Sequence, residues 1–113
     1  SEIHHNKKKD IPSGTAISLA KSAQEGFKGI AKLSYREENK NKARGKNEIG
    51  FASIRGGDVI GEHTVYFFLN GERIELKHMA SSRKIFSVGA LKAASWLHQK
   101  KAGLYTIPDM LKE

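Results

Sequence analysis

Apolar residues recur along this chain with two periods, one typical of helices and one typical of strands. After Ser13-Gly14-Thr15 they return every three or four positions, which predicts a helix that ends at Gly26 or Gly29. The apolar stripe of this helix consists of Ala16, Leu19, Ala20, Ala23 and Phe27. Either Ser13 or Thr15 can cap the helix start by accepting a hydrogen bond from a free amide of the first turn.

Five strands are predicted from runs of β-branched, aromatic or alternating residues. Their ranges are 2–5, 30–36, 49–55, 62–69 and 72–80. In the last range Ile74, Leu76 and His78 share one side, so we expect that side to be covered and the other to be solvated. The Asn70-Gly71 pair before it predicts a tight hairpin turn. The polar stretch 37–47 is interpreted as a loop.

The C-terminal third of the chain favours helices. One is predicted over 87–101, with Gly103 as its C-cap, and a short one is predicted over 104–113, starting after Pro108. The order of elements indicates an α+β fold. We expect a mixed, largely antiparallel sheet of about four strands, with one covering helix and a C-terminal helix.

Composition narrows the function classes. The 113 residues suit a single domain, and the absence of Cys excludes disulfides, Cys-ligated zinc and a thiol nucleophile. The longest apolar run, 65–69, is far shorter than the roughly 18 residues of a membrane span. These features fit a cytoplasmic protein that does not bind membranes. Because the chain starts at Ser1 without Met, we expect an excised piece of a longer protein.

The formal net charge of +8 predicts an anionic partner. Basic residues gather at 7–9 and along the polar stretch 28–46, where a solvated surface is the simplest interpretation. Only Tyr35 lies near that stretch, whereas single-strand binders interleave aromatic and basic residues. A nucleic-acid-binding module therefore remains an alternative supported by charge alone.

The segment 4–15 combines imidazoles, an ammonium group and a helix start. The amides of Gly14 and Thr15 would point out of the positive end of the helix, which makes an anion site for a carboxylate or phosphate. Lys8 can add a second electrostatic contact, and a nearby His can donate a proton near neutral pH. The adjacent pair His4 and His5 is a weak metal site, because neighbours on an extended segment face opposite sides.

Two further clusters are simpler when taken alone. The run 54–64 reads as a glycine-rich turn between two strands, with His63 as a structural residue. Arg83 follows the last strand, where it could bind a carboxylate bidentately or form a surface ion pair. No G-x-G-x-x-G or Walker A motif occurs, so the chain has no recognisable nucleotide cradle, and no residue set has convincing metal-ligand spacing.

Together these clusters resemble the C-terminal region of the dihydrodipicolinate reductase family. The family signature H-H-x-x-K-x-D-A-P-S-G-T-A is matched at His4, His5, Lys8, Asp10, Pro12, Ser13, Gly14, Thr15 and Ala16. Ile11 replaces the usual Ala. The family's R-G-G-D segment is matched over 55–64, its A-S-S-R over 80–83 and its G-L-Y over 103–105.

The resemblance implies an enzyme of lysine and diaminopimelate biosynthesis that reduces a cyclic, unsaturated dicarboxylate with NADPH or NADH. It implies catalytic roles for His4 and Lys8, although His4 and His5 both remain candidates for the proton source. The implied substrate-binding residues are His5, Ser13, Gly14, Thr15 and Arg83. Family members form tetramers through the sheet of this region, so a homo-oligomer is expected.

The resemblance also implies a division of the chain. Residues 1–82 would form the substrate-binding and oligomerisation domain, and 83–113 would return to a separate dinucleotide-binding domain. Without that domain the chain should bind no cofactor and be inactive, and Trp96 and Leu97 should be unusually exposed or packed on another copy. A purely structural oligomerisation domain is the remaining alternative.

Overall fold

A computed structural model describes residues 1–28, 30–35, 41 and 43–112 of the chain. The chain forms two compact units, Ser1–Met79 and Ala80–Glu113, and each is described by itself. Residues 37–40 and 42 of the predicted loop 37–47 lie outside the described residues.

The first helix, α1 (Gly14–Gly26), begins where the sequence predicts. Ser13 has an extended backbone and caps the helix, since its Oγ accepts a hydrogen bond from the amide of Ala16 at 3.2 Å. Ala16 and Ala20 are the buried residues of α1, and the helix contacts strand β5 (Gly61–Phe68). The core of the first unit therefore lies along the small side chains of the helix.

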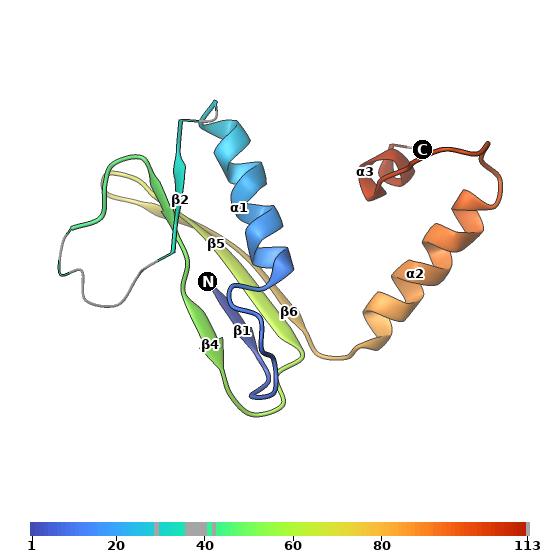
Figure 1. Cartoon of the computed structure of the whole chain (residues 1–113), viewed down its shortest axis with the longest axis horizontal. Coiled ribbons are helices and arrows are strands. Elements are labelled where there is room, and N and C mark those ends of the chain that lie inside the picture. Colours follow the sequence, from blue (N-terminus) through green and yellow to red (C-terminus); the bar gives the residue numbers. More distant parts are fainter. Residues whose placement is uncertain (29, 36–40, 42, 113) are drawn as a thin grey trace. The chain divides into compact units, whose positions relative to one another are not determined.

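A four-stranded sheet in the order β4-β1-β5-β6 forms the centre of the first unit. Figure 1 shows β1 (Glu2–His4) between β4 (Ser53–Arg55) and β5, beneath α1. β1 runs parallel to β4 and antiparallel to β5. Together with three helices, this mixed sheet confirms the predicted α+β class.

The predicted strand 49–55 is wrong as a single element. It is divided into β3 (Glu48–Gly50), which pairs in parallel with β2 (Lys32–Ser34), and β4, which pairs with β1. The two pieces thus belong to two different sheets. At the break, the Phe51 ring stacks on Tyr35 with 5.0 Å between ring centroids, which holds the chain where it changes sheets.

The last strand, β6 (Arg73–Ala80), follows a turn at Asn70-Gly71, where Gly71 adopts a φ of 80°. The turn is confirmed by a hydrogen bond from the amide of Leu69 to the carbonyl of Glu72. The expectation of a covered face on this strand is wrong for the chain by itself. Ile74 is 50% exposed and Leu76 is 63% exposed, because no described residue covers these side chains.

The second unit contains α2 (Lys84–Leu97) and α3 (Ile107–Leu111). The second helix begins three residues before the predicted start and ends at Leu97, with His98 rather than Gly103 as its C-cap. α3 begins at Ile107, two residues before the predicted start after Pro108, because Thr106 and Asp109 form a capping box around Pro108. None of the residues of α2 is buried, and Leu97 is 48% exposed, as the resemblance implies. Trp96, for which the same exposure is expected, is instead half-buried, with its ring edge-on to Tyr105 and 5.5 Å between centroids.

The cap of α1 can be tested by substitution. We expect Ser13→Ala to lower the free energy of unfolding by about 1 kcal/mol, because one amide of the first turn loses its acceptor. The matched control is Ser18→Ala, which changes an exposed residue within the same helix and should cause no loss. Urea unfolding of the two variants measures the difference, and equal stabilities would contradict the capping role.

Candidate functional site

Two polar side chains of β1 are buried on one face of the sheet. Residues two apart on a strand face the same side, so Glu2 and His4 point the same way. Both are buried, with 1% and 8% of their surfaces exposed. His4 Nδ1 contacts Glu2 Oε2 within hydrogen-bond distance. A carboxylate and an imidazole are thus paired at the centre of the first unit.

Arg55 joins this pair from the neighbouring strand. In the β1–β4 register Arg55 lies opposite His4, and its guanidinium reaches back to Glu2. Nη1 donates to Oε2 and Nη2 donates to Oε1, each at 2.7 Å. Nη2 also donates to the carbonyl of Asp10 at 2.7 Å. Arg55 therefore connects β4, β1 and the loop that follows β1.

Glu2 is ionised in this setting. Burial acts to raise the pKa of Glu2, but the two hydrogen bonds from Arg55 oppose it. Hydrogen bonds from His4 and from the amide of Ser13, at 3.2 Å, lower the pKa further. The net pKa is about 2, so the carboxylate only accepts hydrogen bonds at neutral pH.

The start of α1 lies beside the pair. Gly14 and Thr15 are exposed in the first turn, where helix amides lack a carbonyl partner one turn earlier. Ser13 is 2% exposed, and its Oγ is occupied by the amide of Ala16 and by His63 Nε2, at 3.0 Å. The predicted anion site is therefore open at Gly14 and Thr15, while the Ser13 hydroxyl is part of the supporting structure.

His63, on β5, belongs to the same cluster. Its ring lies edge-on to the ring of His4, with 5.0 Å between centroids. Burial lowers the pKa of His63, and the nearby His4 lowers it further. A neutral His63 is thus favoured between Ser13 and His4.

His5 and Lys8 occupy the turn after β1. Both are half-buried, and the amide of Lys8 donates to the carbonyl of His5. Lys8 Nζ lies 2.8 Å from Asp10 Oδ1, and this hydrogen bond lowers the pKa of Asp10. The ammonium group is held by a partner that is itself 58% exposed, so a stronger anion could compete for it.

Arg83 belongs to the second unit. It is exposed and occupies the N-cap position of α2, without a side-chain hydrogen bond that caps the helix. Its predicted role in substrate binding stays a prediction. The other candidates, from His4 to Thr15, all lie in the first unit.

The structure adds three residues to the site, namely Glu2, Arg55 and His63. The E-x-H spacing of Glu2 and His4 on a strand was a usable signal, because it places both on one side. The spacing from Arg55 to Glu2 carries no such signal, since their contact depends on a parallel pairing of distant strands.

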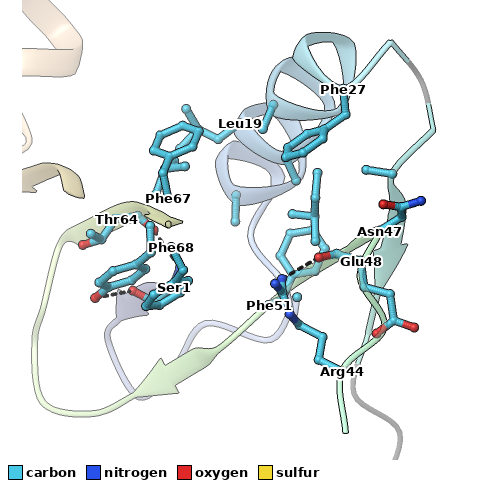
Figure 2. A pocket seen from close by; sticks show the side chains of 18 of the residues that line it. Ser1, Leu19, Phe27, Arg44, Asn47, Glu48, Phe51, Thr64, Phe67 and Phe68 are labelled. Carbon is cyan, nitrogen blue, oxygen red and sulfur yellow. Dashed lines mark hydrogen bonds between the residues drawn. The ribbon is translucent and has the colours of Figure 1, made fainter. Parts of the chain in front are cut away.

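A separate apolar pocket of about 530 Å³ lies in the first unit. Figure 2 shows Leu19 of α1, Phe27 at the C-cap of α1, and Phe67 and Phe68 around it. It includes none of the predicted site residues. Within the described part of the chain, no group of His, Asp and Glu is arranged to hold a metal ion, and no helix is long and apolar enough to cross a membrane.

Comparison with known proteins gives a consistent family. The family model described as "Dihydrodipicolinate reductase, C-terminus" matches residues 1–111. The 4-hydroxy-tetrahydrodipicolinate reductase of Sulfurimonas denitrificans is 50% identical over 98% of this chain and 44% of its own length. That of Geotalea daltonii is 49% identical over 97% of this chain and 42% of its own length. The chain thus spans less than half the length of these relatives.

A solved structure has the same fold. The dipicolinate-bound dihydrodipicolinate reductase from Paenisporosarcina sp. TG-14 matches with a TM-score of 0.70 and 23% identity. The match covers 96% of this chain and 42% of the other.

The low pKa of Glu2 predicts a pH-dependent stability. The shift from an ordinary value of 4.5 to about 2 corresponds to roughly 3 kcal/mol. Because the pKa is lowered in the folded state, this stabilisation is present above about pH 4.5 and is lost as the pH falls towards 2. Urea unfolding at pH 6 and at lower pH should show a smaller loss for Glu2→Gln than for the unsubstituted chain.

The control is Glu62→Gln, whose carboxylate pairs with Lys77 at 3.3 Å on the same sheet. This variant should keep the full pH dependence. If Glu2→Gln lost as much stability on acidification as the control, the ionised buried carboxylate would be ruled out.

Proposed function

The chain belongs to the family of dihydrodipicolinate reductase C-terminal domains, and from this premise we propose that it forms the substrate-binding part of an oxidoreductase. The proposed substrate is a cyclic, unsaturated dicarboxylate, 4-hydroxy-tetrahydrodipicolinate, which the whole enzyme reduces to tetrahydrodipicolinate in lysine and diaminopimelate biosynthesis. The observation that carries this proposal is the open start of α1 beside the buried imidazole of His4.

A dicarboxylate suits the charges around this helix start. One carboxylate can accept hydrogen bonds from the exposed amides of Gly14 and Thr15, where the helix dipole favours negative charge. Lys8 and His5, in the turn after β1, can meet the second carboxylate. For Lys8 this means exchanging its exposed partner Asp10 for the ligand. Arg83 is proposed as a further carboxylate contact.

His4 is the proposed proton donor, and Lys8 is proposed to assist it. A nicotinamide cofactor, NADPH or NADH, supplies the hydride when it is bound in the whole enzyme. The sequence of the chain has no glycine-rich dinucleotide motif that would hold this cofactor. We therefore propose that the 113-residue chain alone is inactive, because such a motif would have to position the nicotinamide near the substrate from outside this chain.

Apolar surfaces support a homo-oligomer, proposed as a tetramer. On β6, Ile74, Leu76 and Met79 are each at least half exposed. We propose that 1–82 assembles through this sheet. Residues 83–113 would instead contact the dinucleotide-binding domain through α2, where Leu91 is 72% exposed.

Pyridine-2,6-dicarboxylate, a planar analogue of the proposed substrate, tests the site directly. We expect the chain to bind it, and Lys8→Gln to weaken binding about tenfold or more, because one charged contact of at least ~1.4 kcal/mol is lost. Lys21→Gln is the control, since Lys21 is an exposed lysine on α1. Isothermal titration gives the affinities, and equal weakening by both substitutions would leave only a general charge effect.

The nucleic-acid alternative rests on the net charge of +8. A titration with single-stranded RNA distinguishes it, because phosphate contacts make affinity fall steeply with salt. Tight, salt-sensitive RNA binding without dicarboxylate binding would favour that alternative over the proposed dicarboxylate site.

A further inference from the structure

The proposed function leaves the buried carboxylate of Glu2 without a role. Its two oxygens accept hydrogen bonds from Arg55 at two nitrogens, from the amide of Ser13 and from His4. Arg55 and the Ser13 amide join strands and helix, as expected for a structural carboxylate. The fourth donor is the ring of His4, which the proposed reaction uses.

The hydrogen bond to His4 determines where the ring carries its proton. Glu2 is ionised and can only accept, so Nδ1 of His4 must be the donor in this contact. In a neutral imidazole one nitrogen carries hydrogen and the other does not. The neutral form of His4 is therefore the Nδ1–H tautomer, and Nε2 is the nitrogen that gains and loses the second proton.

Nε2 of His4 lies close to the backbone of β5 at Gly61. A Cβ atom added at Gly61 would lie 3.1 Å from His4 Nε2, closer than most side chains approach. Gly61 does not have a positive φ, so the backbone conformation does not require glycine there. The missing side chain lets the His4 ring pack closely on β5, with Nε2 as the ring nitrogen that Glu2 does not bind.

We propose that Glu2 is a positioning residue, which holds Nδ1 of His4 so that Nε2 gives its proton to the bound substrate. This inference rests on the proton-donor role proposed for His4. In the reaction proposed for the whole enzyme, Nε2 would give its proton to one carbon of the substrate double bond, and a nicotinamide cofactor bound outside this chain would supply the hydride for the other. The imidazolium becomes the neutral Nδ1–H imidazole, and the carboxylate stays ionised throughout.

The variant Glu2→Gln gives a specific expectation. Its amide has one oxygen and one NH₂ group for the two positions of the carboxylate oxygens. At the Oε1 position the NH₂ group would face two groups that can only donate, Arg55 Nη2 and the Ser13 amide. At the Oε2 position it would face only one such group, Arg55 Nη1, together with His4 Nδ1, which can become an acceptor if the ring changes tautomer. We therefore expect the substitution to move the neutral ring's proton from Nδ1 to Nε2.

The experiment is a two-bond ¹H–¹⁵N spectrum of the uniformly labelled 113-residue chain, at a pH where His4 is neutral. His4 is assigned by the signals that disappear in His4→Gln. In the unsubstituted chain Nδ1 should have the shift of a protonated nitrogen and Nε2 that of an unprotonated one. In Glu2→Gln the two shifts should exchange, whereas in the control Glu62→Gln they should not.

A proton on Nε2 in the unsubstituted chain would overturn the proposal without any variant, so it remains testable even if Glu2→Gln fails to fold. A folded Glu2→Gln with an unchanged tautomer would overturn it as well. Titration with pyridine-2,6-dicarboxylate separates this result from the proposed function. Absent binding with an Nδ1–H ring would count against the substrate site and leave the Glu2–His4 contact standing.

Discussion

The structure of the first unit depends on one buried carboxylate. A lone ionised side chain at this depth would cost several kcal/mol, because it leaves water for a medium of low polarity. Glu2 avoids this cost by receiving donors from a neighbouring strand, from the start of α1 and from His4. Each donor comes from a different part of the chain, so satisfying the charge also fixes where these parts lie.

Within the candidate site, some residues hold the structure together and others are exposed on the surface. The carboxylate of Glu2, the two Nη atoms of Arg55 and the hydroxyl of Ser13 are engaged within the protein. Gly14 and Thr15, by contrast, leave the first turn of α1 exposed. A dianionic ring would thus meet amides whose direction is already set by the buried cluster, which reduces the entropy lost on binding.

Local patterns predicted much of this, because they depend on neighbours in the sequence. The apolar stripe and Ser13 located α1, and Asn70-Gly71 located the hairpin. Long-range features were missed. Whether a stretch such as 49–55 stays in one sheet depends on which strands pair with it. Whether the side chains on one face of β6 are buried depends on which other part of the protein covers that face. The residues of the segment 4–15 were predicted as site residues from one motif, whereas Glu2 and Arg55 are brought together by a strand pairing that no single motif encodes.

The most direct measurement of the central claim is a crystal structure of the chain with pyridine-2,6-dicarboxylate. The account predicts one carboxylate on the amides of Gly14 and Thr15, with the ring of the ligand facing Nε2 of His4 and Nδ1 still bound to Glu2. A ligand seated in the apolar pocket around Phe27 would contradict it. So would a His4 ring turned away from the carboxylate while the ligand occupies the start of α1.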